Sequence, residues 1–352
     1  MINLIKNIFI LLFILLATFE VCARIDDKIK WDADFFSDYS SKLLLIDDEL
    51  GRHNRPNAQF EKWKINKYGF RGPEITPSKE KGVIRIAFMG ASETFGLYES
   101  PNMEYPAQIR SKLNYLYPGE YEVINVSCAG MTLPKAIEYY KDWISKFSPD
   151  FVFYYPSPAV YLDVNAPHNK LNPETPNKKR GTFKLRIVGK LKNVGKELVP
   201  SRVQTYIKMK VIDNIVGKYP SGWAWESPPP DRVDLLRTHL LQLISTIRSQ
   251  DCEIVLMTHA NRFSIPHNPN DTAQLMSWRK FYPRASGECL ISMDNAANEI
   301  IRKIGIEVKV PVVDIDKGIP KDANNFADFV HFTDAGARKV ASIITSFIIH
   351  SR

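Results

Sequence analysis

Short runs of apolar and β-branched residues recur along the chain and alternate with longer segments of helical periodicity. Such runs are typical of strands buried on both faces of a parallel sheet. Between them, apolar residues recur three or four positions apart, which predicts amphipathic helices. The runs predicted as strands are residues 84–89, 123–127, 151–155, 254–257 and 310–314. The segments predicted as helices are residues 107–117, 134–147, 233–250, 291–304 and 334–349.

This alternation predicts a doubly wound α/β fold, in which a parallel five-stranded sheet has helices on both faces in the three layers of a flavodoxin-like domain. Ligands of such sheets bind outside the carboxyl ends of the strands. Residues 164–231 interrupt the alternation, are rich in Pro, Lys and Asn, and end in three prolines at 228–230. We interpret this basic segment as an insertion over or beside the site.

The N-terminus is an almost unbroken apolar run. From residue 8 to residue 19 only Thr18 is polar, and with its flanks the run reaches about 20 residues, enough to cross a bilayer once. Val21-Cys22-Ala23 also provides the small residues of a signal-peptide cleavage site. Residues 1–23 are therefore predicted to be a retained membrane anchor or a cleaved signal. Both alternatives place the rest of the chain outside the cytoplasm, in the periplasm or secreted, if Lys6 marks the inner side.

The remaining chain divides into a leader and one large domain. Residues 24–80 are polar with scattered aromatic residues and end in Tyr68-Gly69-Phe70-Arg71-Gly72-Pro73. Residues 81–352, with the insertion at 164–231, are long enough to bury a substantial core without disulfides. The four cysteines have no spacing typical of a metal site.

The net charge of +8 is distributed unevenly. Residues 178–218 contain twelve Lys or Arg and only two acidic residues, Glu197 and Asp213. This basic block is predicted either to pack its apolar face on the body of the protein or to lie on an anionic membrane surface. No nucleic-acid motif accompanies the charge, and we expect no nucleic-acid partner. The apolar residues at loose helical spacing in the block are Leu185, Val188, Leu191, Val194 and Leu198.

Two short segments far apart in the chain carry the candidate chemistry. Gly90-Ala91-Ser92 follows the first predicted strand, and Asp328-Phe329-Val330-His331 precedes the last predicted helix. Serine is a weak nucleophile at neutral pH and needs a base, which a third group must orient. Ser92, His331 and Asp328 are therefore the predicted nucleophile, base and orienting carboxylate.

The sequence blocks around these residues resemble those of the SGNH/GDSL hydrolase superfamily. The first block is residues 86–96, with Ala91 where the superfamily usually has aspartate, and the second is residues 125–130. The last and most specific block is residues 328–336. The resemblance covers roughly residues 65–350 without the insertion, and the leader and apolar N-terminus resemble those of anchored bacterial members.

The resemblance implies a serine esterase that needs no metal or organic cofactor. Its oxyanion would be stabilised by the backbone N–H groups of Ser92 and Gly130. The third block departs from the superfamily, which places an asparagine after the third strand as a further donor, whereas residues 156–162 here contain none. Losing one oxyanion donor typically lowers turnover about 10²- to 10³-fold. The side chains that could substitute for it are Ser157, Asn165, His259 and Asn261.

The sequence therefore predicts an SGNH-type esterase that removes an O-acyl group, most simply acetyl, from a cell-envelope carbohydrate or a similar ester. The substrate class follows from location and resemblance alone. Two alternatives stay open because of the missing asparagine. One is an O-acyltransferase that uses the same Ser-His-Asp site, and the other is a non-catalytic glycan-binding or assembly protein.

Overall fold

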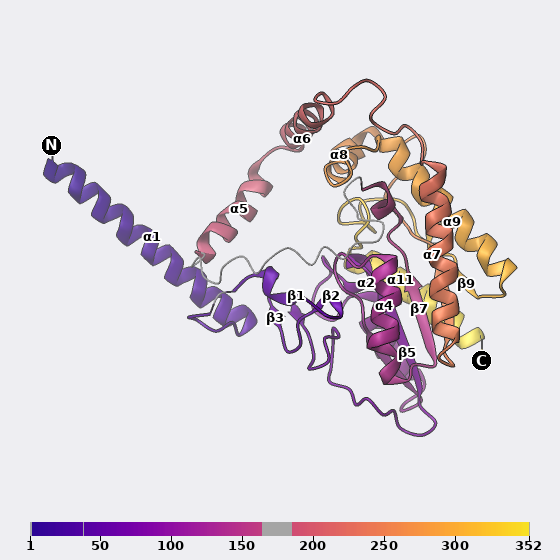
Figure 1. Ribbon diagram of the computed structural model, residues 1–352. Coiled ribbons are helices and arrows are strands. Elements are labelled where there is room, and N and C mark those ends of the chain that lie inside the picture. Colours follow the sequence, from indigo (N-terminus) through magenta and orange to yellow (C-terminus); the bar gives the residue numbers. More distant parts are fainter. Residues whose placement is uncertain (1, 38, 164–184, 352) are drawn as a thin grey trace.

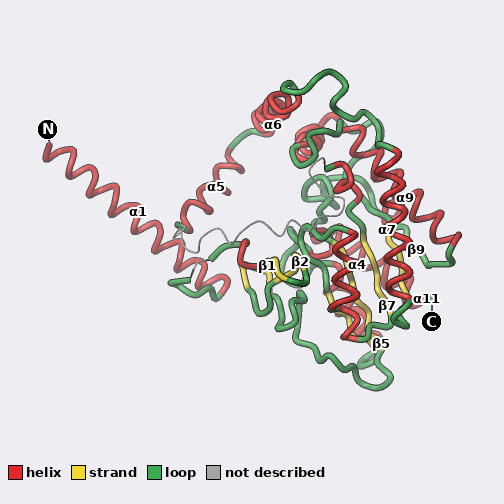
Figure 2. The backbone as a smooth tube through the Cα atoms, viewed as in Figure 1, coloured by secondary structure: helices red, strands yellow, loops and turns green. Residues whose placement is uncertain are grey.

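A five-stranded parallel sheet lies at the centre of the computed structural model, which describes residues 2–37, 39–163 and 185–351 (Figures 1 and 2). Its strand order is β6-β5-β7-β8-β9. The predicted doubly wound α/β fold is confirmed, and each predicted run overlaps one strand. The strands are β5 (Ile84–Gly90), β6 (Tyr121–Asn125), β7 (Phe151–Tyr155), β8 (Glu253–Met257) and β9 (Val312–Val313).

The strands bury side chains on both faces of the sheet. Along β5, Ile86 and Phe88 belong to one core cluster and Ala87 and Met89 to the other, because successive side chains of a strand point to opposite faces. This explains why the runs are continuously apolar. Helices α3 (Tyr105–Leu116) and α11 (Asp334–His350) cover the first face, and α4 (Leu133–Asp142), α7 (Pro230–Arg248) and α9 (Gly287–Glu307) cover the second.

The leader folds onto the sheet domain. Phe70 and Ile75 are buried in the main core, and the backbone N–H of Arg71 donates to the carbonyl oxygen of Asn125 in β6 over 2.9 Å. The leader thus extends the domain at its β6 edge. Its strands are β1 (Leu45–Asp48), β2 (Gly51–Asn54), β3 (Gln59–Phe60) and β4 (Trp63–Lys64).

Several short elements lie in the connections of the chain. The short α-helices are α2 (Ser92–Phe95), α8 (Thr272–Arg279) and α10 (Ile315–Gly318). The 3₁₀ helices are η1 (Ser41–Leu44), η2 (Ile144–Phe147), η3 (Pro158–Leu162) and η4 (Pro269–Asp271).

Two helices stand apart from the sheet domain, and a third joins them to it. Helix α1 (Ile2–Trp31) projects away from it, and α5 (Arg186–Leu198) leads from α1 towards α6 (Ser201–Val216) (Figure 1). Helix α5 packs on α1, and α6 packs on α8. By length and composition, residues 5–31 of α1 could cross a membrane. The first part of the predicted insertion, which contains Asn165, lies outside the described residues.

A buried guanidinium holds the start of β5 in place. Arg85 is fully buried and pairs with Glu122 of β6. It also donates to the carbonyl oxygens of Pro77 at 2.7 Å, of Thr76 at 2.8 Å and of Phe147. Buried carbonyl groups that lose their donors keep their full desolvation cost, so this one side chain stabilises the leader, β6 and the segment before β7 together.

We therefore expect Arg85→Ala to lower the free energy of unfolding by about 3 kcal/mol, because it leaves buried acceptors without donors. Denaturant titration monitored by circular dichroism measures this loss. The matched control is Arg237→Ala, which removes a half-exposed ion pair with Glu307 and should cost less than about 1 kcal/mol. Equal losses in the two variants would contradict the role of Arg85.

Candidate active site

Four strands of the sheet deliver polar groups to one edge. Ser92 follows β5, Gly130 follows β6, Ser157 follows β7 and His259 follows β8. All four line a pocket of about 240 Å³, to which the loop before α11 contributes His331. The pocket therefore lies at the carboxyl ends of the strands, where ligands of α/β sheets bind.

The turn from β5 into α2 requires a glycine. A Cβ atom at Gly90 would lie 2.3 Å from Oγ1 of Thr94 and 2.8 Å from the carbonyl oxygen of Tyr155, so no other residue fits. The close approach places Ser92 at the first position of α2, facing the pocket. On the other side of the pocket, Gly130 has φ of +80°, a left-handed conformation that glycine adopts without strain.

The structure brings the three residues of the predicted triad together. Nε2 of His331 lies 2.8 Å from Oγ of Ser92. Nδ1 of His331 lies 2.8 Å and 2.9 Å from the two carboxylate oxygens of Asp328. Asp328 is itself oriented by the backbone N–H groups of Val330 and His331, at 3.0 Å and 2.9 Å. Residues 328–331 thus form a tight loop in which the carboxylate of Asp328 orients the imidazole of His331.

The electrostatics of this pair favour a charged imidazole. Burial by itself lowers the pKa of His331, but the hydrogen bond and the negative charge of Asp328 outweigh it, so the pKa of His331 lies above its ordinary value. Burial likewise raises the pKa of Asp328, yet His331 and the two backbone donors bring the pKa of Asp328 below its usual range. Asp328 therefore stays ionised at neutral pH and stabilises a proton on His331.

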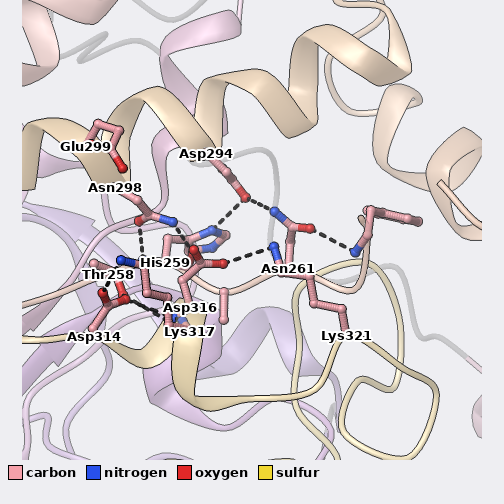
Figure 3. A network of polar contacts seen from close by, with 12 residues as sticks. Thr258, His259, Asn261, Asp294, Asn298, Glu299, Asp314, Asp316, Lys317 and Lys321 are labelled. Carbon is pink, nitrogen blue, oxygen red and sulfur yellow. Dashed lines mark hydrogen bonds and ion pairs between the residues drawn. The ribbon is translucent and has the colours of Figure 1, made fainter. Parts of the chain in front are cut away.

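The candidate substitutes for the missing asparagine separate into three groups. Ser157 and His259 both line the pocket. Asn261 is buried outside the lining, where its amide donates to Asp294 over 2.9 Å and accepts the N–H of Phe263 at 2.8 Å (Figure 3). Asn165 lies outside the described residues. Only Ser157 and His259 are thus placed at the pocket among the candidates that the structure describes.

Sequence reasoning missed a buried carboxylate beside the nucleophile. Glu93 lines the pocket and lies 4% exposed. One of its oxygens is 3.2 Å from Oγ of Ser92, and the other is 3.4 Å from Nε2 of His259. The hydroxyl of Ser157 donates to both oxygens, at 3.1 Å and 3.2 Å. The only sequence signal for Glu93 was its position directly after Ser92. That signal is weak, because adjacent residues of a helix usually point in different directions.

Sequence reasoning also missed the aromatic wall of the pocket. Helix α8 was not predicted, although Trp278 from it and Phe281 just after it line the pocket. Trp278 stacks on Phe329 with ring centroids 5.6 Å apart. A short polar helix inside a loop gives a weak periodic signal, so only the fold locates these rings. Among the described residues, no cluster of three His, Cys, Asp or Glu could hold a metal ion.

Comparison with known proteins gives likenesses of fold at low sequence identity. No protein-family model matches this chain, and no curated protein matches its sequence. The chain is similar to the crystal structure of a GDSL-like lipase from Bacteroides thetaiotaomicron, with 11% identity, a TM-score of 0.44 and coverage of 79% of this chain and 93% of that one.

Two further solved structures are similar to this chain. A lipase/acylhydrolase from Enterococcus faecalis is 15% identical with a TM-score of 0.44, over 76% of this chain and 95% of that one. An acetylxylan esterase from Geobacillus stearothermophilus is 14% identical with a TM-score of 0.42, over 75% and 94%. At such low identities and TM-scores, neither the substrate nor the mechanism of these proteins can be assigned to this chain. The assignment of function therefore depends on the geometry of the site itself.

Proposed function

We propose that this chain is a serine esterase that cleaves O-acyl esters through an acyl-enzyme. The observation that carries the proposal is the 2.8 Å contact between Oγ of Ser92 and Nε2 of His331, with Asp328 on the other ring nitrogen. A nucleophile, a base and an orienting carboxylate in hydrogen-bond contact are what acyl transfer from an ester requires.

In the proposed reaction, Oγ of Ser92 attacks the ester carbonyl while its proton passes to Nε2 of His331. Asp328 stabilises the imidazolium that forms. His331 then returns the proton to the leaving alcohol, and a water molecule activated by His331 releases the acid. The backbone N–H groups of Ser92 and Gly130 would stabilise the oxyanion, and the hydroxyl of Ser157 is the pocket donor that could turn towards it.

The size and lining of the pocket support a short acyl group. At about 240 Å³, the pocket is smaller than the roughly 300–1,000 Å³ that encloses a drug-sized ligand. At its wall, the ring of Phe281 is 65% exposed and suits the apolar face of a sugar ring. We propose an acetyl ester of a cell-envelope carbohydrate as the substrate.

We propose that α1 is retained as a membrane anchor. The helix continues without a break through Val21-Cys22-Ala23, the segment that a signal peptidase would need to bind. Glu20, on the N-terminal side, is buried, pairs with Arg24 at 2.7 Å and accepts the backbone N–H of Ile187 at 3.1 Å. Cleavage after Ala23 would remove this partner and expose the start of α5, so the contacts favour the anchor over the cleaved signal.

We further propose that the exposed face of α5 lies on the same membrane. Its charged face is bound to the end of α1, since Lys190 lies 2.6 Å from Asp26 and 2.8 Å from Asp27. Helix α5 therefore starts at the depth where the apolar part of α1 ends, and in Figure 1 it runs across the direction of α1. Its apolar residues Val188, Leu191, Val194 and Leu198 are 51% to 76% exposed. They do not pack on the body of the protein, which favours the membrane alternative for the basic block.

We expect Ser92→Ala to lower turnover of p-nitrophenyl acetate at least about 10³-fold, because it removes the nucleophile. A fluorophosphonate probe should label the wild type at Ser92, as mapped by peptide mass spectrometry. The control Ser249→Ala changes an exposed serine at the end of α7 and should retain both signals. A folded wild type that is neither labelled nor active would contradict the proposal. Acetate transferred to an added sugar, instead of released, would assign transfer.

The anchor proposal predicts that a C-terminally tagged chain is found in membranes with residues 1–23 still attached. Intact mass spectrometry after carbonate washing measures both properties. As a control, the double substitution Leu11→Arg and Leu12→Arg interrupts the apolar run and should release the chain, because each charge at the centre of a span costs about 2.5–3.5 kcal/mol. Soluble protein that begins at Arg24 would show a cleaved signal instead.

The position of α5 predicts the accessibility of spin labels in proteoliposomes that contain anionic lipid. With Cys22→Ser to remove the exposed native thiol, a label at Val194→Cys should be more accessible to oxygen than to an aqueous nickel chelate. A label at Gly189→Cys, an exposed position about 140° away around the helix, should show the reverse preference. Equal access of nickel to both labels would contradict contact with the bilayer.

A further inference from the structure

A second buried acid–base array stands behind the nucleophile. Nδ1 of His259 lies 2.8 Å from Oδ2 of Asp294 in α9, and Nε2 of His259 faces Glu93. The amide of Asn298 clamps the backbone of His259, accepting its N–H at 2.7 Å and donating to its carbonyl at 2.8 Å (Figure 3). Glu93, His259 and Asp294 are each at least 96% buried. The proposed reaction has no step for these groups.

The geometry fixes the charges of this array. Each ring nitrogen of His259 faces a carboxylate, and a nitrogen lone pair cannot face a carboxylate without repulsion, so both nitrogens carry protons. Burial alone lowers the pKa of His259, but the charges of Asp294 and Glu93 raise it to about 10. Burial alone raises the pKa of Glu93, yet the hydrogen bond from His259 and the nearby charge of His331 bring it to about 2. Glu93 is therefore an anion next to Ser92.

The hydroxyl of Ser92 consequently has two acceptors and one proton. Nε2 of His331 is the nearer at 2.8 Å, and Oε2 of Glu93 is 3.2 Å away. When Nε2 is unprotonated, the shorter contact favours donation to His331, which is the arrangement that attack requires. When Nε2 carries a proton it must donate to Oγ, and the hydroxyl can then donate only to Glu93.

We infer that Glu93 is a second acceptor for the Ser92 hydroxyl, oriented by Ser157 and by the His259–Asp294 pair, and that it moves the acid limb of the pH dependence of catalysis to higher pH. The inference rests on the proposed esterase function. Glu93 completes a chain of hydrogen bonds in the inactive form, from Asp328 through protonated His331 and Ser92 to its own carboxylate, and so stabilises that form.

The sign of the effect follows from the charge of Glu93. An anion near His331 favours the imidazolium, which raises the pKa of His331. Catalysis needs His331 unprotonated at Nε2, so Glu93 shifts the onset of activity to higher pH. The charged and titratable groups that face His331 are Asp328 on its own loop, Glu93 on α2, and Glu99 and Tyr98 on the loop after α2.

Kinetics of the full chain in detergent test the inference. We measure kcat/KM for p-nitrophenyl acetate from acidic to mildly alkaline pH in the wild type and in Glu93→Gln. The glutamine keeps an acceptor for His259 but removes the charge. The pKa of the acid limb should fall by about one unit, so the variant should be more active than the wild type, relative to its own plateau, at acidic pH.

Glu99→Gln is the matched control. Burial raises the pKa of Glu99 to about 7, so this carboxyl is mostly neutral on the acid limb, and it acts on His331 through space without a contact to Ser92. Its substitution should move the acid limb by less than half as much as Glu93→Gln. An acid limb that stays in place or moves up in Glu93→Gln, or that moves equally in both variants, overturns the inference.

A titration that needs no activity separates this inference from the proposed function. The ring nitrogens of His331 are followed by NMR in protein labelled with ¹⁵N at histidine. The pKa of His331 should fall in Glu93→Gln, and also in Ser92→Ala, which removes the hydroxyl that links Nε2 to Glu93. Unchanged His331 titration in both variants overturns the role of Glu93, whereas an inactive wild type with the expected titration overturns only the esterase proposal.

Discussion

The parallel pairing of β5 with both β6 and β7 is the constraint on which the site depends. The register places Phe88 beside Asn125 and Gly90 beside Tyr155, so the neighbouring strands end at nearly the same level. The chain therefore leaves each strand at one edge, and the segments that follow bring Ser92, Gly130 and Ser157 around one pocket. A shift of register in either pairing would separate these groups, because each residue of a strand advances about 3.3 Å.

The second constraint is the balance of buried charge around the nucleophile. Two histidine–carboxylate pairs converge on it, His331 with Asp328 and His259 with Asp294. The additional carboxylate of Glu93 lies between them. A buried charged side chain without a partner would carry a large desolvation cost, so each of these charged groups is paired with one of opposite sign. Residues 156–162 contain no asparagine, and the hydroxyl of Ser157 in this segment donates to Glu93.

The helices outside the sheet connect the pocket to the membrane proposed for α1. Helix α5 is bound to the end of α1, and α6 packs on α8, where Nζ of Lys208 lies 2.5 Å from Oγ of Ser277. The next residue, Trp278, forms part of the pocket wall. If α1 and α5 lie in and on the membrane as proposed, this connection through α6 would keep the pocket close to a substrate held at the cell envelope.

The sequence by itself determined the sheet, the helices on its two faces and the predicted triad of Ser92, His331 and Asp328. Continuous apolar runs can only be buried on both faces, and the Gly-x-Ser and Asp-x-x-His segments are local patterns whose residues lie within a single turn. Only the tertiary structure decided the rest. Glu93 and Asp294 are separated by 201 positions in sequence and become partners of His259 only when α9 packs against β8. The ring of Trp278 reaches the pocket because α8 folds back over the sheet edge, and the apolar face of α5 stays exposed because α1 binds its charged face. Such pairings depend on which elements pack together, and no periodicity along the chain encodes that choice.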